Sequence, residues 1–298
     1  MIKNILIIFN PVAGHKYPKY FKKNVLRLVK KYLPITNFEW LETLPNLSKQ
    51  LKEANLVQFD RLIVIGGDGT IKAIANFLLQ NNFDIPLAII PQGSANILAS
   101  SLDVPLITNL AIKTACKGVH KKMDVGLLNN EQYFLICLSI GFWSKVVHET
   151  KRGLKIKLGF LAYLVTYFKQ KKIKHTTYKF KVDGKHYQMQ GNTFVIANTM
   201  SLFKIKPKKP IDFFDGLFDI ITVSNSSFWG FLLMGIFAIF NQRFVPFLKM
   251  YQGKKITICP PHDTVQKIQI DGEIFKSKKI EVEIIPQKLS IITRALKH

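Results

Sequence analysis

The sequence predicts a two-domain α/β protein, in which an N-terminal domain built on a parallel sheet precedes a mostly antiparallel C-terminal domain. Three observations lead to this fold class. The chain has 298 residues, which is enough for about two domains of ordinary size. Over residues 1–122 strand and helix patterns alternate with short connections, as in a parallel sheet covered by helices. From Met123 onward strand patterns dominate, and Asp-Gly pairs mark tight turns.

The predicted N-terminal domain, residues 1–122, is an alternation of strands and helices. Short apolar runs predict strands over Ile5–Phe9, Phe38–Leu41, Leu62–Ile65 and Leu87–Ile90. Helical patterns lie between them, over Tyr20–Tyr32, Asn46–Val57 and Ile71–Leu79, and a further helix begins within Ala95–Ser101. The C-terminal tail, residues 290–298, contains the apolar run Ser290–Thr293, and the sequence leaves open whether this run returns to the first domain.

The predicted C-terminal domain, residues 123–289, consists mainly of strands. They are expected over Gln132–Leu138, Tyr178–Val182, Thr193–Ala197, Phe218–Val223, Lys255–Cys259, Val265–Ile270 and Lys279–Ile285. Helical patterns interrupt them over Lys155–Phe168 and Ser227–Phe240. The second of these is the longest apolar stretch, and it is shorter than the roughly 20 residues of a membrane-spanning helix.

The cysteines and the N-terminus indicate a cytoplasmic protein. Cys116, Cys137 and Cys259 form no Cys-x-x-Cys pair, so neither a disulfide framework nor a zinc site is expected. The first apolar run is too short for a signal peptide, lacks a cleavage site and is better interpreted as a strand.

The charge of the chain predicts an anionic partner. Lys and Arg number 43 against 19 Asp and Glu, for a formal net charge of +24. The segment Lys155–Lys172 mixes basic with aromatic and aliphatic residues, which suits an anionic bilayer surface. We expect Lys155, Lys157, Lys169 and Lys171 to contact such a membrane peripherally, although an amphipathic helix packed on the core would show the same pattern. No nucleic-acid-binding module is recognisable, so nucleic acid is not the expected partner.

Three glycine-bearing loops follow three of the predicted parallel strands. They are Asn10–Gly14, Gly66–Thr70 and Pro91–Asn96. Ligands of open parallel sheets bind beyond the carboxyl ends of the strands, so the three loops are expected to meet at one site.

The middle loop carries the sharpest chemical signal. Its glycines let backbone N–H groups approach a ligand, and the following helix directs its N-terminal dipole to the same place, which favours phosphate. A carboxylate beside phosphates is repulsive unless a cation lies between them, so Asp68 is interpreted as a Mg²⁺ ligand or as a partner of one. The competing interpretation is a glycine turn that only closes a strand–helix corner. In the third loop, Ser94 either caps the next helix or donates to a phosphate, and Asn96 is either a first-turn residue or a site contact.

Six short motifs together resemble one known family. They are Asn-Pro-x-x-Gly at 10–14, Gly-Gly-Asp-Gly-Thr at 66–70, Pro-x-Gly-Ser-Ala-Asn at 91–96, Met-Asp-Val-Gly at 123–126, Asp-Gly-Leu-Phe-Asp at 215–219 and Asp-Gly-Glu at 271–273. Their order and spacing resemble the diacylglycerol kinase catalytic family, which includes bacterial diacylglycerol kinases, YegS-like lipid kinases and sphingosine kinases. The resemblance covers essentially the whole chain. Gly-Gly-Asp-Gly-Thr alone is shared with NAD kinases, and the second half separates the families. The resemblance implies a nucleotide domain, a larger β-sandwich-like domain and an active site in the cleft between them.

The resemblance also implies roles for individual residues. Asp68 and Asp124 match acids of a catalytic Mg²⁺ network, and Glu273 matches the proton acceptor for the lipid hydroxyl. A second, structural Mg²⁺ site is matched by Asp212, Asp215 and the carbonyl of Leu217, although acids near a turn are more often solvated loop residues. The positions matched to ATP binding, together with neighbours in the same loops, are Asn10, Pro11, Val12, Ala13, Gly14, Thr43, Gly66, Gly67, Asp68, Gly69, Thr70, Ile71, Lys72, Ala73, Gly93, Ser94 and Asn96.

The chain departs from the family pattern at several positions. They are Lys72-Ala73, Ile97, Trp143 and Met200–Lys204. These departures affect the expected choice of substrate more than the expected chemistry, because Asp68, Asp124 and Glu273 are all present.

The resemblance implies an ATP-dependent and Mg²⁺-dependent kinase that phosphorylates a lipid hydroxyl at a membrane surface. Diacylglycerol is the default acceptor, and a sphingoid base or another lipid alcohol is the alternative. Two other functions remain open: a soluble NAD kinase, and a relative that binds nucleotide or lipid without catalysis. A homodimer is also left open.

Overall fold

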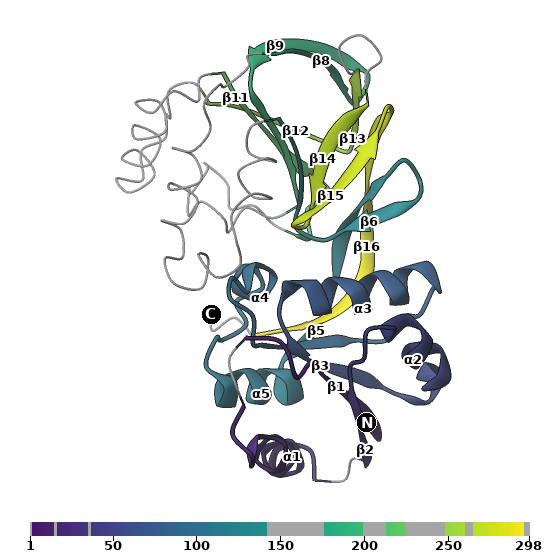
Figure 1. Ribbon diagram of the computed structural model, residues 1–298, viewed down its shortest axis with the longest axis vertical. Helices are drawn as coiled ribbons and strands as arrows, with labels where there is room; N and C mark the ends of the chain where they lie inside the picture. Colours follow the sequence, from purple (N-terminus) through teal and green to yellow (C-terminus); the bar gives the residue numbers. More distant parts are fainter. Residues whose placement is uncertain are drawn as a thin grey trace. The chain divides into compact units, whose positions relative to one another are not determined.

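The computed structural model describes residues 2–14, 17–34, 37–141, 176–198, 213–224, 248–259 and 265–294, and it forms two compact units (Figure 1). The first unit comprises Met1–Met123 with Gln287–His298, and the second comprises Asp124–Pro286. The fold class predicted from the sequence is confirmed, because the first unit contains a parallel sheet with helices and the second contains antiparallel sheets.

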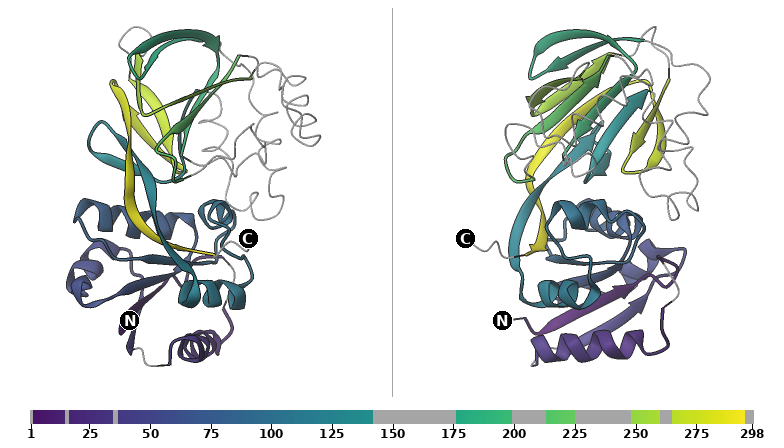
Figure 2. Two further views of the ribbon diagram at one scale, coloured as in Figure 1. Left: turned by 180° about the vertical axis from the view of Figure 1, so that it is seen from behind. Right: turned by 90° about the vertical axis from the view of Figure 1, so that its left-hand side faces the viewer.

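The first unit is a parallel sheet in the order β2-β1-β3-β4. Its strands are β1 (Asn4–Phe9), β2 (Asn37–Glu42), β3 (Arg61–Gly66) and β4 (Leu87–Pro91). Every residue of β3 and β4 is buried, as expected for central strands with both faces covered. The helices are α1 (Phe21–Tyr32), α2 (Leu47–Glu53), α3 (Asp68–Gln80), α4 (Ile97–Ser101) and α5 (Thr108–Lys117), with a short 3₁₀ turn η1 (Leu56–Gln58). Helix α3 lies on one face of the sheet, and α1 and α5 lie on the other (Figures 1 and 2).

The first unit is completed by the end of the chain. Strand β16 (Ile280–Thr293) begins in the second unit, and at its far end Ile291 pairs in parallel with Leu87 of β4 and Ile292 with Ala88. Leu289, Ile291 and Ile292 are buried there. The chain also passes from the first unit to the second within one strand, β5 (Val119–Leu128).

The second unit contains two antiparallel sheets. One has the order β12-β11-β10-β7-β14-β15, and the other contains β16, β13, β8 and β9, with β5 paired to β16 and β6 paired to β5. The remaining bounds are β6 (Gln132–Phe134), β7 (Cys137–Gly141), β8 (Thr176–Val182), β9 (Lys185–Gly191), β10 (Thr193–Ala197), β11 (Phe218–Val223), β12 (Leu248–Gly253), β13 (Lys255–Cys259), β14 (Gln266–Ile270) and β15 (Glu273–Ser277).

Aromatic side chains from the two sheets form the core of the second unit. Phe134 of β6 stacks on Phe218 of β11 with ring centroids 5.6 Å apart, and Phe180 of β8 meets Phe194 of β10 edge-on at 4.9 Å. All four rings are fully buried. Each pair joins one sheet to the other, so the unit packs as a sandwich.

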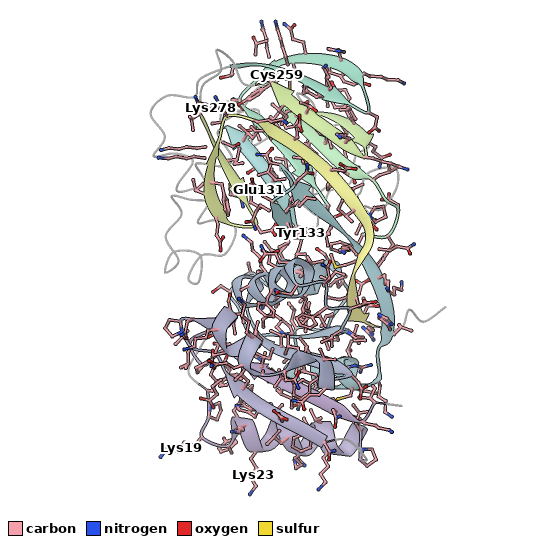
Figure 3. The ribbon with its side chains drawn as sticks, turned by 90° about the vertical axis from the view of Figure 1, so that its right-hand side faces the viewer. Lys19, Lys23, Glu131, Tyr133, Cys259 and Lys278 are labelled. Carbon is pink, nitrogen blue, oxygen red and sulfur yellow. The ribbon has the colours of Figure 1, made fainter. Side chains whose placement is uncertain are left out.

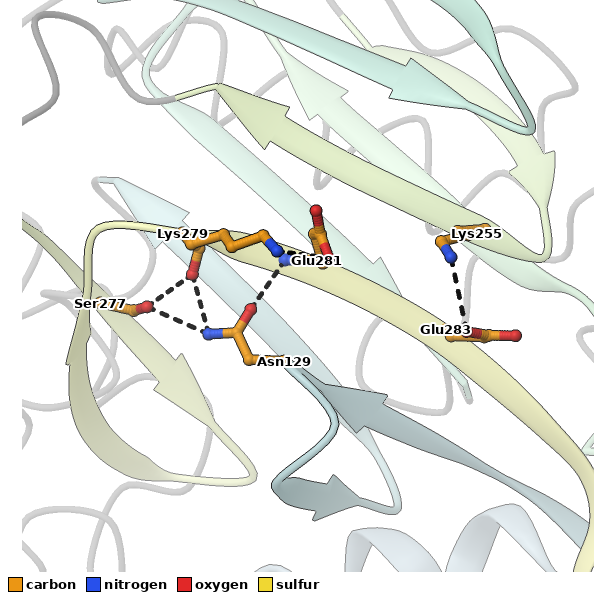
Figure 4. A network of polar contacts seen from close by, with 6 residues as sticks. All are labelled: Asn129, Lys255, Ser277, Lys279, Glu281 and Glu283. Carbon is orange, nitrogen blue, oxygen red and sulfur yellow. Dashed lines mark hydrogen bonds and ion pairs between the residues drawn. The ribbon is translucent and has the colours of Figure 1, made fainter.

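An asparagine turn connects the strands at one end of this sandwich (Figure 4). Asn129 has φ +50°, its side-chain amide donates to Ser277 Oγ and to the carbonyl of Lys279, and its Oδ1 accepts the N–H of Glu281. The turn between β5 and β6 is thereby tied to the connection between β15 and β16.

Several elements differ from their predicted extents. The helix expected over Asn46–Val57 ends at Glu53, because Asn55 adopts a left-handed conformation (φ +43°). The single strand expected over Gln132–Leu138 is divided into β6 and β7 at Leu135 and Ile136, whose N–H groups bind a carboxylate and not a neighbouring strand. The helices expected over Lys155–Phe168 and Ser227–Phe240 lie outside the described residues. Among the described residues, no helix is both long enough and apolar enough to cross a bilayer.

Candidate functional site

The structure brings the three glycine loops together at one edge of the first unit's sheet. The N–H of Asn10 donates to the carbonyl of Ile65 at 3.0 Å, and the N–H of Gln92 donates to the carbonyl of Gly66 at 2.8 Å. These bonds join the first loop to the end of β3, and the third loop to the same strand end. Thr43 directly follows β2 at the same edge of the sheet, and its N–H donates to the carbonyl of Phe9.

The loops approach so closely that side chains would not fit between them. A Cβ on Gly93 would lie 2.6 Å from the Cα of Gly67, and one on Gly14 would lie 2.1 Å from the carbonyl oxygen of Gln92. Gly14 also has φ +73°, which a residue with a side chain rarely adopts. The glycines therefore let the backbones of the three loops pack closely where they meet.

Asn10 and Thr70 connect the first loop to the second. Asn10 Nδ2 donates to Thr70 Oγ1 at 2.7 Å, and Asn10 Oδ1 accepts the N–H of Val12 at 3.0 Å. Within this first loop Pro11 and Val12 are exposed and Ala13 is buried.

Asp68 is the first residue of α3, and its carboxylate binds the start of another helix. Oδ2 accepts the N–H of Ile97 and Oδ1 that of Leu98, both at 3.1 Å. Burial raises the pKa of Asp68, and these backbone hydrogen bonds oppose that rise. Asp68 thus satisfies the first N–H groups of α4 from a distant position in the sequence. The predicted Mg²⁺ role of Asp68 stays a prediction.

Asn96 closes the third loop on itself. Its Oδ1 accepts the N–H of Gly93 at 2.7 Å, and its Nδ2 donates to the carbonyl of Gly93 at 2.9 Å. Asn96, with φ +49°, is the residue that precedes α4, so Ser94 does not occupy the capping position and is instead exposed. The capping role considered for Ser94 is therefore wrong, and its contact with a phosphate stays a prediction.

The remaining matched positions lie in α3. Ile71 and Lys72 are buried and Ala73 is exposed, while Gly69 and Thr70 occupy the first turn. Gly66 ends β3 and packs against the side chain of Thr70.

Asp124 is buried in β5 of the second unit and is held by the loop that precedes β11. Its Oδ2 accepts the N–H of Gly216 at 2.8 Å, and its own N–H donates to the carbonyl of Phe213. Asn198, at the end of β10, donates from Nδ2 to the carbonyls of Asp124 and Leu135. Sequence reasoning did not identify Asn198 as an anchor, and its place at the end of a predicted strand was the only local signal.

The predicted structural Mg²⁺ site is described only in part. Asp212 lies outside the described residues, whereas Asp215 is exposed and accepts the N–H of Leu217 at 3.0 Å. Asp219 is buried and accepts from Gln252, and burial, with a smaller effect of the charge on Asp215, raises the pKa of Asp219 to about 6. The described residues contain no cluster of three or more acidic, histidine or cysteine side chains that could hold a metal. This metal site therefore stays a prediction.

Glu273 follows a two-residue turn between β14 and β15. Asp271 (φ +46°) and Gly272 (φ +93°) form the turn, and Glu273 pairs with Ile270. The carboxylate of Asp271 accepts three backbone N–H groups, those of Leu135, Ile136 and Cys137, at 2.8–2.9 Å. Sequence reasoning missed this role of Asp271, which fixes the turn that presents the exposed Glu273.

Several predicted positions lie outside the described residues. They are the membrane contacts Lys155, Lys157, Lys169 and Lys171, and the departures at Trp143 and Met200–Lys204. Within the described residues, the candidate site consists of the three loops in the first unit and, separately, the Asp124 and Glu273 environments in the second.

Known proteins resemble the chain over most of its length. A family model described as the diacylglycerol kinase catalytic domain matches residues 4–128, and one described as the YegS C-terminal NAD kinase beta sandwich-like domain matches residues 138–293. The diacylglycerol kinase of Bacillus subtilis (strain 168) is 28% identical over 246 residues, which cover 80% of this chain and 79% of that protein. An uncharacterized protein of Synechocystis is 29% identical over 311 residues, covering 96% of this chain and 69% of that protein.

Solved structures share the fold. The crystal structure of a diacylglycerol kinase from Bacillus anthracis str. Sterne aligns with a TM-score of 0.74 and 20% identity, covering 98% of this chain and 97% of that one. A second structure from the same organism aligns with a TM-score of 0.80 and 24% identity, covering 98% of this chain and 96% of that one. The two family models match the chain in the order that its motifs indicate, and the second alone covers more than half of it. The chain therefore belongs to the diacylglycerol kinase and YegS-like lipid kinase family.

Proposed function

We propose that the protein is an ATP-dependent lipid kinase that transfers the γ-phosphate to a lipid hydroxyl, with diacylglycerol as the first acceptor to test. The observation that carries the proposal is the meeting of the three glycine loops at the start of α3, in a chain whose two halves both match the family. The protein would act peripherally at an anionic membrane in the cytoplasm, where its charge of +24 is complementary to the lipid surface.

The loops of the first unit suit the phosphates of a nucleotide. The close approach of Gly67 and Gly93 brings the second and third loops together, and Gly67 offers no side chain to cap the first N–H groups of α3. A helix N-terminus with exposed amides attracts an anion through its dipole and through direct hydrogen bonds. The same loops would therefore hold ATP by its phosphates.

The carboxylates present also suit a hard cation. Carboxylate oxygens are the ligands that Mg²⁺ prefers, and those of Asp68 lie at the start of α4, where they also accept the N–H groups of Ile97 and Leu98. Asp68 and Asp124 are the residues that we propose as holding Mg²⁺, directly or through water. When bound, the ion would neutralise negative charge on the transferring phosphate.

The chain's own part in the chemistry is to position the reactants and to accept a proton. The lipid oxygen forms a bond to the γ-phosphorus while the bond from that phosphorus to the β–γ bridging oxygen breaks, and ADP leaves with the electron pair. The hydroxyl proton passes to the carboxylate of Glu273, which we propose as the general base. Asp271 would hold the Glu273 turn in place through its three backbone hydrogen bonds.

The test is transfer of radiolabelled phosphate from ATP and Mg²⁺ to a panel of lipids in anionic mixed micelles, with NAD in parallel. We expect a labelled lipid. Glu273→Gln should lower kcat by about 100-fold or more while ATP affinity changes little. Glu131→Gln is the matched control, because Glu131 is also an exposed glutamate at a hairpin turn of the second unit (Figure 3).

Other results would replace the proposal. Labelled NAD would indicate a soluble nucleotide kinase. ATP binding without transfer to any acceptor in the panel would indicate a relative that lacks catalysis. An unchanged kcat in Glu273→Gln would remove Glu273 as the base.

A further inference from the structure

A patch of exposed apolar side chains lies at the start of α5 in the first unit. Leu106, Ile107 and Leu110 are 57%, 66% and 49% exposed, and Val119, just beyond the helix, is also exposed. Four of the nine large apolar residues exposed among the described residues therefore fall within one short segment. The concentration is unusual, since exposed apolar residues normally occur singly.

The core does not explain this patch. Helix α5 buries the opposite set of residues, Ala111, Ile112, Ala115 and Cys116, and packs on β4 and beside α1 (Figure 1). Arg61, which is itself buried, donates from Nη1 to the carbonyls of Ala115 and Cys116 and so holds the last turn of the helix. The helix is anchored through one face and presents the other to the surroundings.

Positive charge surrounds the apolar residues. Lys113 and Lys117 are exposed at three and seven positions after Leu110, so the three side chains lie along one face of the helix. They line a pocket of about 300 Å³ together with Arg294, which directly follows β16. Residues 104–123 include four lysines and no acidic residue. We refer to Leu106, Ile107, Leu110, Lys113, Lys117 and Arg294 as the α5 surface.

We propose that the α5 surface docks the protein on an anionic lipid bilayer. Apolar side chains flanked by lysine and arginine match an interface where acyl chains lie beneath anionic headgroups. A second copy of the chain is a poorer occupant, because a two-fold contact between two α5 surfaces would bring two sets of cations together, with no acidic residue in 104–123 to pair with them. The inference rests on the proposed function, which places the substrate in a membrane. It assigns a membrane contact to the first unit, in addition to the one expected at Lys155–Lys172.

The experiment measures co-sedimentation of the full chain with vesicles, without ATP. One set is phosphatidylcholine alone, and the other is phosphatidylcholine mixed with phosphatidylglycerol. We expect binding to the anionic vesicles only. Lys113→Gln with Lys117→Gln should weaken that binding by about 30-fold, the change expected for loss of two cations at the surface. Leu106→Ser with Ile107→Ser should weaken binding at high salt as well as at low salt, since its contribution is not screened.

Matched controls are available in the same unit. Leu44 and Val57 are 58% and 77% exposed and lie outside the α5 surface, so Leu44→Ser with Val57→Ser should bind as the wild type does. Lys49→Gln with Lys52→Gln removes two exposed charges from α2 and should have a much smaller effect than the α5 pair.

Three results would overturn the proposal. In the first, both α5 variants bind anionic vesicles as tightly as the wild type does. In the second, the wild type does not bind anionic vesicles. In the third, sedimentation analysis shows that the wild type self-associates and that Leu106→Ser with Ile107→Ser does not. Because no turnover is measured, failure of the α5 surface and failure of the kinase proposal are distinguishable. If the kinase is active, phosphorylation of a soluble short-chain lipid should be unaffected by the α5 variants, and loss of that activity would also contradict the proposal.

Discussion

Aspartate side chains hold distant parts of this chain together by accepting backbone N–H groups. Asp68 binds the start of α4, Asp271 binds the connection between β6 and β7, and Asp183 binds the N–H groups of Lys254 and Lys255. The sequence marks Asp68 as a motif acid and the other two as turn residues. It could not show their acceptor roles, because the partners are from 29 to 136 residues away.

Replacement of Asp271 should destabilise the second unit. Asp271→Ala leaves the N–H groups of three buried residues without their acceptor, and we expect a loss of about 2–4 kcal/mol in the free energy of unfolding, measured with urea. Asp183→Ala is the matched control. Asp183 (φ +47°) also begins an Asp-Gly turn, but its carboxylate accepts the N–H groups of two exposed residues, Lys254 and Lys255. If Asp183→Ala lowered the free energy of unfolding equally, the effect would come from the conformation of the turn and not from the lost acceptor.

The cysteines should differ in reactivity with a thiol reagent. Burial raises the pKa of Cys116 to about 11 and raises that of Cys137 as well, so neither forms thiolate at pH 8. Cys259 is exposed (Figure 3). We expect one thiol to react rapidly in the native protein and all three in denaturant, measured by absorbance. Rapid reaction of a second thiol would show that one buried cysteine is accessible in solution.

At the scale of elements, the strands that form continuous apolar runs were predicted most exactly. Strands β3 and β4 are buried throughout, so they appear as continuous apolar runs and were predicted within one residue at each end. Strands β9, β12 and β15 mix exposed polar with partly buried residues and were not predicted. Strand β5, whose first half is largely exposed, and the ten-residue helix α5 were not predicted either. These strands are held in the extended conformation by hydrogen bonds to neighbouring strands, which no local pattern reveals.

The contact between the second and third glycine loops gives a prediction at this scale. Gly93→Ala places a Cβ against Gly67 and should cost about 1–3 kcal/mol of stability, with weaker ATP binding. Gly69→Ala is the control for stability, because nothing lies within 4 Å of its new Cβ and alanine is the better helix former by about 1 kcal/mol. The measurement is thermal unfolding with and without ATP. A destabilised Gly69→Ala, or an unaffected Gly93→Ala, would contradict this packing.

At the scale of the whole molecule, composition and motif order were sufficient for the fold class and the family. The convergence of three loops followed from a general rule for parallel sheets, and the structure shows the backbone contacts that the rule cannot supply. The pairing of Ile291 with Leu87 joins residues separated by most of the chain, and no local pattern encodes such a parallel pair.

Removal of residues 287–298 should therefore unfold or strongly destabilise the first unit. The deletion takes away three buried apolar side chains and uncovers one side of β4. We expect a large fall in melting temperature, followed by circular dichroism, and loss of ATP binding. Removal of residues 295–298 alone is the control and should leave both unchanged. If the variant without residues 287–298 melted at the same temperature as the full-length chain, the sheet would be stable without β16.

The late return of β16 also bears on synthesis of the protein in the cell. Domains usually fold one by one as the ribosome delivers them, the N-terminal one first. Here the N-terminal unit cannot close its sheet until residues 287–293 have been translated, so β4 keeps an open edge while the entire second unit is made. A prematurely terminated chain would keep that apolar edge uncovered and would be a natural target for chaperones and proteases.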